Sequence, residues 1–78
     1  MFINVKIMNN GEKKIVAYSD DTTIRAICEE NGIDYSTPGT YLDGQPLRAG
    51  DYDQTLADFG FAEECRLQRL VKQDAAAR

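Results

Sequence analysis

The chain has 78 residues, which is enough for one small domain. Its apolar fraction of 42% and charged fraction of 28% are those of a globular protein and exclude a disordered one. Thirteen acids against nine bases give a net charge of −4, which disfavours nucleic-acid binding. No apolar run reaches the roughly 20 residues of a membrane helix, and the start shows no signal peptide. We therefore expect a cytoplasmic domain that binds neither nucleic acid nor membrane.

The first twenty residues predict a β-hairpin. A first strand is indicated by apolar residues at alternate positions, which are Ile3, Val5 and Ile7. Residues 9–11, Asn-Asn-Gly, are a turn signal because they tolerate a positive φ, and residues 13–18 follow as a second strand. Both sides of this second strand are partly apolar, so its facing stays open. The two alternatives for its buried side are Ile15 with Ala17, or Val16 with Tyr18.

A helix is predicted after residues 20–23, where Asp21 or Thr22 is expected to cap the free N–H groups. Its apolar face follows the spacing i, i+3 and i+4 and consists of Ile24, Ile27 and Cys28. Gly32 is expected to end the helix in a left-handed C-cap, with Ile33 folding back onto it.

Short elements are predicted in the second half of the chain. After a loop over residues 34–39, a strand–turn–strand segment is predicted over residues 41–47, and Pro46 makes its second strand an edge strand. Residues 55–60 predict one capped helical turn, and residues 65–71 predict the last strand. With one helix on one face of a mixed sheet, the expected fold class is α+β.

Three of these segments resemble ubiquitin and its relatives, in the same order along the chain. They are Ser19–Ile24 at the helix entry, Tyr41–Leu47 at the strand–turn–strand, and Thr55–Phe59 at the short helical turn. The resemblance implies a ubiquitin-like β-grasp domain over residues 1–72, with a four- to five-stranded sheet, followed by a flexible tail over residues 73–78. The sulfur-carrier proteins of thiamine and molybdopterin synthesis share this fold.

One departure from that family concerns the C-terminal segment. Ubiquitin and the sulfur carriers end in Gly-Gly, and an activating enzyme adenylates the terminal carboxylate. Here the last residues are Asp74–Arg78, and no Gly-Gly dipeptide occurs. A second departure is Gln45, which stands where ubiquitin has a chain-linking lysine. We therefore expect a non-catalytic adaptor or accessory domain. The alternative is a sulfur-carrier-like or covalent protein modifier that is activated at an atypical C-terminus.

No catalytic residue, cofactor site or metal site is predicted. The chain lacks histidine, which is the commonest general base and zinc ligand. We expect Cys28 and Cys65 to be reduced core thiols, because secreted domains of this size usually carry several disulfides. Asp51 and Asp53 are followed by no closing Glu of a calcium loop.

The candidate binding site is the sheet face opposite the predicted helix, which would bind a protein partner that the sequence does not identify. Its residues are Lys6, Met8, Tyr41, Arg48, Arg66, Gln68 and Leu70. Tyr41 joins through its resemblance to an exposed apolar position of ubiquitin. An apolar centre with a basic rim is typical of interfaces, although solvated strand residues are the plain alternative. Arg69 extends the rim only if a bulge or the end of pairing keeps it from turning inward. We expect a monomer.

Overall fold

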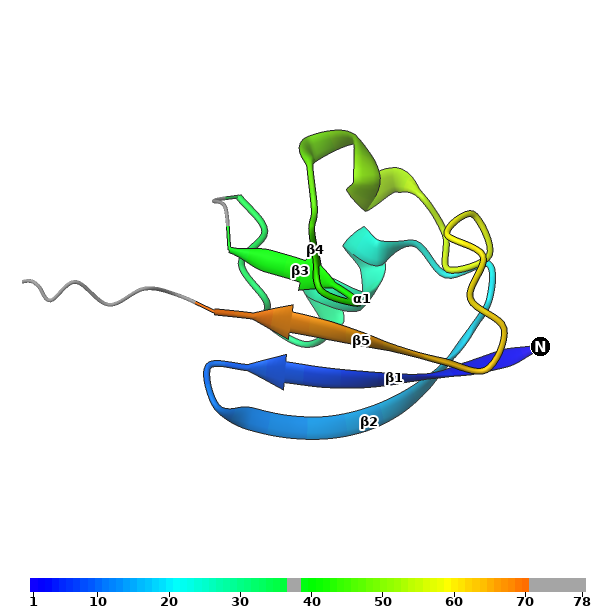
Figure 1. Ribbon diagram of the computed structural model, residues 1–78, viewed down its shortest axis with the longest axis horizontal. Coiled ribbons are helices and arrows are strands. Elements are labelled where there is room, and N and C mark those ends of the chain that lie inside the picture. Colours follow the sequence, from blue (N-terminus) through cyan, green and yellow to red (C-terminus); the bar gives the residue numbers. More distant parts are fainter. Residues whose placement is uncertain (37–38, 71–78) are drawn as a thin grey trace, which may run out of the picture.

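The computed structural model describes residues 1–36 and 39–70. Its elements are β1 (Phe2–Asn9), β2 (Glu12–Ser19), α1 (Ile24–Glu30), β3 (Thr40–Leu42), β4 (Gln45–Pro46), the 3₁₀ helix η1 (Ala49–Asp53) and β5 (Glu64–Arg69). The five strands form one sheet in the order β2-β1-β5-β3-β4, and α1 packs across one face (Figure 1). The sheet is mixed because β1 and β5 are parallel and the other pairs are antiparallel. The predicted tail, together with Pro38 and Val71, lies outside the described residues.

The hairpin of β1 and β2 settles the facing that the sequence leaves open. Asn10 and Gly11 have φ values of 53° and 94°, so the turn uses the left-handed conformations that these residues tolerate. The register set by this turn pairs Val16 with Val5, whose side chain is buried under α1. Val16 therefore packs against the core, as does Tyr18. The other side of β2 meets solvent.

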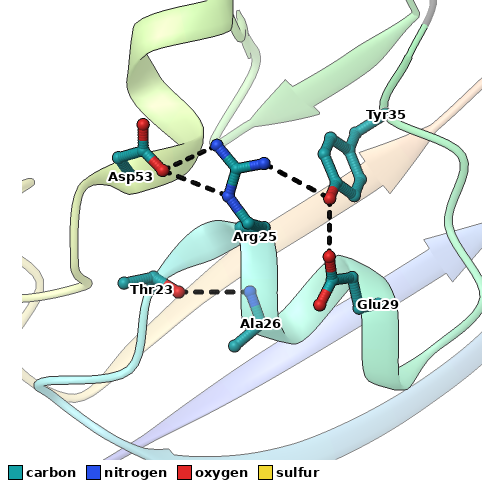
Figure 2. A network of polar contacts seen from close by, with 6 residues as sticks. All are labelled: Thr23, Arg25, Ala26, Glu29, Tyr35 and Asp53. Atoms are coloured by element: carbon teal, nitrogen blue, oxygen red, sulfur yellow. Dashed lines mark hydrogen bonds and ion pairs between the residues drawn. The ribbon is translucent and has the colours of Figure 1, made fainter.

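The helix begins at a different cap from the predicted one. The Thr23 side-chain oxygen accepts the N–H of Ala26 at 3.2 Å, so the expectation of Asp21 or Thr22 as the cap was wrong (Figure 2). Asp21 accepts the Ser19 hydroxyl at 2.6 Å instead, which holds its carboxylate in the turn before the helix.

The end of the helix follows the prediction. Gly32 has a φ of 69°, and the N–H of Ile33 donates to the carbonyl of Cys28 at 2.9 Å. Ile33 is buried, so the chain folds back over the helix end and adds an apolar side chain to the core.

The core lies between α1 and the inner face of the sheet. Its buried apolar residues are Ile3, Val5, Ile7, Ile24, Ile27, Cys28, Ile33, Leu42, Tyr52, Leu56, Cys65 and Leu67. Tyr52 comes from η1, an element missing from the predicted order. Leu56 comes from the predicted helical turn, which is closed by the N–H of Phe59 donating to the carbonyl of Thr55 at 3.3 Å. Within the residues described, no helix is long and apolar enough to cross a membrane.

Arg69 turns inward without a bulge. It is the last residue of β5, pairs with Asn9 on one side and Thr40 on the other, and is only 5% exposed. Its guanidinium Nη1 donates to the Thr40 hydroxyl at 3.1 Å, and Thr40 is itself buried. Arg69 is therefore a buried cation held by hydrogen bonding, and it does not belong to the rim of the outer face.

Polar contacts tie α1 to η1 and to the segment before β3 (Figure 2). Arg25 donates to the Asp53 carboxylate through Nη2 at 2.6 Å and Nε at 3.1 Å. The Tyr35 hydroxyl donates to Glu29 at 2.7 Å, and the Arg25 guanidinium lies 5.5 Å from the centre of the Tyr35 ring. This network occupies the helix side of the molecule, so the sheet face opposite α1 is the candidate for binding.

Candidate protein-binding face

Strand pairing brings five of the seven predicted binding residues together on the outer sheet face. Met8, Gln68 and Tyr41 form one row across β1, β5 and β3. Lys6 and Arg66 pair in the neighbouring row. All five alternate with buried residues of their strands, so their side chains point away from α1.

The remaining two predicted residues are Leu70, which lies on the outer face, and Arg48, which does not. Leu70 directly follows β5, its N–H donates to the carbonyl of Gly39 at 3.0 Å, and its side chain is 55% exposed. Alternation from Gln68 places Leu70 on the outer face. Arg48 lies outside the sheet, at the start of η1, where its N–H donates to the Asp51 carboxylate at 2.9 Å. We therefore define the open-face patch as Lys6, Met8, Tyr41, Arg66, Gln68 and Leu70.

The sequence reasoning missed the contribution of β2 to this face. Ile15 pairs with Lys6 and Lys13 pairs with Met8, so both lie on the outer face, and Ile15 is 64% exposed. A shallow hollow of about 410 Å³ is lined by Lys6, Met8, Lys13, Lys14 and Ile15. If Val16 is assigned to the core side, the contribution of β2 to the outer face follows, because its neighbour Ile15 must then point outward.

The outer face is locally basic although the chain is acidic overall. Lys6, Lys13 and Arg66 lie on it, while Glu64 pairs with Asn4 at one end. Asp43 and Glu64 line a hollow together with Lys6 and Arg66, so two carboxylates lie beside these cations. An exposed apolar set among cations favours a ligand that combines apolar and acidic groups.

No protein-family model matches the sequence, and no curated protein matches it. Solved structures do match. The ubiquitin-like domain of an Arabidopsis thaliana protein superposes with a TM-score of 0.67 at 21% identity, covering 99% of this chain and 84% of that one. For the ubiquitin-like domain of Plasmodium falciparum Dsk2 the TM-score is 0.59 at 26% identity, covering 90% and 100%. For the ubiquitin of Caldiarchaeum subterraneum it is 0.61 at 17% identity, covering 92% and 98%.

The chain has the ubiquitin-like β-grasp fold. The strand order, the packing of α1 across one face and the predicted α+β class all agree with this assignment. The three matching segments named from the sequence lie at the helix entry, at β3–β4 and at the turn before β5. At these identities the likeness concerns the fold, and the structural matches leave the specific role open.

The two thiols of this ubiquitin-like domain pack in its core. Cys28 and Cys65 are buried free cysteines on α1 and β5. Burial raises the pKa of Cys28 to about 11 and that of Cys65 to about 12. A thiol with so high a pKa is protonated near neutral pH and is a poor nucleophile and metal ligand. In residues 1–36 and 39–70 no three His, Cys, Asp or Glu side chains cluster as metal ligands would.

These thiols predict a loss of stability at alkaline pH. In the unfolded chain each ionises near a pKa of about 8.5, whereas burial keeps the folded values near 11 and 12. The unfolded state therefore releases protons first, so the free energy of unfolding should fall as pH rises from about 8.5 towards these folded values. Urea unfolding at a series of pH values should show a shallower decline for Cys28→Ala and Cys65→Ala than for the parent. Equal slopes would contradict the assigned pKa values, since lysine and tyrosine ionisation is common to all three proteins.

Proposed function

We propose that this chain is a non-catalytic ubiquitin-like binding domain that serves as an adaptor or accessory subunit. It docks a protein partner through the open-face patch. The observation that carries this proposal is the gathering of Met8, Tyr41 and Leu70 beside cations on the face that α1 leaves uncovered. Methionine, aromatic and arginine side chains are enriched in protein interfaces.

The partner surface should be apolar at its centre and acidic around it. Lys6 and Arg66 flank the apolar row, and Lys13 extends the cationic rim along β2. Exposed charges of this kind speed association and select partners more than they add affinity. Binding should therefore slow as salt concentration rises, because screening shortens the reach of these charges.

The chemistry of the side chains supports a binding role over a catalytic one. The chain has no histidine, and both cysteines are buried and protonated at neutral pH. The carboxylates of Asp43 and Asp51 accept the backbone N–H groups of Arg66 and Arg48, both at 2.9 Å, so each has a structural task in a turn.

Truncating the apolar part of the patch tests the proposal. The double variant Tyr41→Ala with Leu70→Ala should reduce capture of specific partners from the native host by about tenfold or more, because interface anchors of this kind carry most of the binding energy. Quantitative mass spectrometry of the captured proteins measures this. The matched control is Gln54→Ala with Glu63→Ala, two exposed residues outside the strands of the sheet, which should keep the same partners.

Circular dichroism must show that both double variants are folded. Unchanged partners in the Tyr41 and Leu70 variant would remove the open-face patch from consideration. A protein recovered from its host with its C-terminal carboxylate converted to a thiocarboxylate, or joined to a lysine, would instead establish the carrier or modifier alternative.

A further inference from the structure

β2 forms a long free edge of the sheet. Among the residues described it pairs with β1 alone, over eight residues, and Figure 1 shows no strand beyond it. It contains neither proline nor glycine, and its register with β1 is continuous. The opposite edge is the two-residue strand β4, which Pro46 blunts. An edge strand like β2 presents backbone donors and acceptors to another strand.

The charges along β2 are arranged with opposite signs at its two ends. Glu12, Lys13 and Lys14 lie near the hairpin turn, so this end carries a net charge of +1. At the other end, the Tyr18 hydroxyl donates to the Glu30 carboxylate, and the Ser19 hydroxyl donates to the Asp21 carboxylate at 2.6 Å. The three residues between these ends are uncharged, and Ile15 among them is largely exposed. Such a strand is complementary to an antiparallel copy of itself.

We propose that two copies of this chain pair antiparallel through β2, about a two-fold axis at Val16. On the helix side Val16 then faces Val16 of the other copy, and Lys14 faces its Tyr18. On the outer side Ile15 faces Ala17, and Lys13 faces Ser19. Lys14 thus lies opposite Tyr18, whose hydroxyl donates to the Glu30 carboxylate. Lys13 lies opposite Ser19, whose hydroxyl donates to the Asp21 carboxylate.

Two neighbouring registers are less favourable. An axis at Ile15 places Glu12 opposite Tyr18, which adds a carboxylate beside Glu30. An axis at Lys14 places two lysines directly opposite each other, and like charges in that position are destabilising. The axis at Val16 pairs residues 13–19 of each copy, and it places Glu12 opposite Asp20, one residue beyond the end of β2.

The resulting dimer has one continuous sheet, with both open-face patches on the same side. A dimer would differ from the monomer expected from the sequence, which did not reveal that the second strand lies at the edge. The isologous contact closes on itself, so it yields dimers and not filaments.

Charge reversal tests the register. Sedimentation of the full chain over a range of concentrations should show a monomer–dimer equilibrium. Lys14→Glu and Glu30→Lys should each weaken the dimer about tenfold, because each homodimer then sets like charges together twice. An equimolar mixture of the two variants should restore dimers, since the heterodimer has opposite charges at both places. Arg48→Glu carries the same charge change off the sheet and should leave the dimer unchanged.

A cross-link supplies an independent measurement if the charge variants fold poorly. Val16→Cys places two cysteines across the axis, with β-carbons about 4.5–5.5 Å apart, so mild oxidation should give a disulfide-linked dimer. Gln45→Cys, exposed on β4 at the opposite edge of the sheet, should stay monomeric under the same conditions. A parent chain that sediments as a monomer up to about millimolar concentration would overturn the proposal. So would a mixture that associates no better than the single variants, or a Val16→Cys protein that cross-links no more than the control.

Discussion

Replacing Leu67 with alanine is expected to lower the free energy of unfolding by about 3–4 kcal/mol. Leu67 is fully buried at the centre of the sheet, where β5 pairs it with Ile7 on one side and Leu42 on the other. Its truncation removes apolar contacts and leaves a cavity that two flanking strands cannot easily close. A domain of this size has only about 5–15 kcal/mol of stability in total, so the loss is large. Urea unfolding followed by circular dichroism measures it.

The control for this prediction is the adjacent residue. Arg66 is exposed and points to the outer face, so Arg66→Ala should change the free energy of unfolding by no more than about 0.5 kcal/mol. Similar costs for Leu67→Ala and Arg66→Ala would show that β5 does not alternate between core and solvent as described.

Gly39→Ala is expected to cost about 3 kcal/mol or more, through two effects that add. Gly39 has a φ of 126°, a conformation that side chains rarely adopt. A β-carbon there would lie 2.8 Å from the carbonyl oxygen of Leu70 and 3.3 Å from Nη1 of Arg69. The first atom is backbone and the second belongs to a buried guanidinium, so neither gives way cheaply. Thermal or urea unfolding provides the measurement.

The control variant Gly60→Ala separates the cost of the backbone conformation from the cost of the steric contacts. Gly60 has a φ of 85°, but nothing lies within 4 Å of an added β-carbon. Its substitution should therefore cost only the conformational penalty of about 1–2 kcal/mol. If Gly39→Ala cost no more than Gly60→Ala, the close packing of Gly39 against Arg69 and Leu70 would be wrong.

Local patterns in the sequence predicted much of the fold. The alternation of Ile3, Val5 and Ile7 fixes β1, and Gly32 ends α1 where a left-handed residue is needed. The expected segments appear in the expected order because each is encoded by neighbours in sequence. Tyr52 was missed for the opposite reason. Its burial depends on η1 packing beside α1, a contact that no local sequence periodicity predicts.

The candidate site was predicted only in part. Lys6, Met8, Arg66 and Gln68 follow from strand alternation, and Tyr41 joins them through its pairing with Gln68. The place of Ile15 could not be predicted, because an apolar residue on either side of β2 satisfies the sequence pattern equally well. The prediction placed Arg48 on the sheet because the length of β4 depends on tertiary packing, which a local sequence pattern does not indicate. β4 ends at Pro46, and the chain then turns into η1.

The parallel contact between β1 and β5 joins the two ends of the described chain in the middle of the sheet. Contacts between residues this distant in sequence slow folding, because a long loop must close before they form. A nascent chain on the ribosome therefore cannot complete the sheet until β5 has emerged from the exit tunnel. A truncated product that lacks β5 would leave β1 and β3 without their shared neighbour, and its exposed strand edges would make it a substrate for chaperones and proteases.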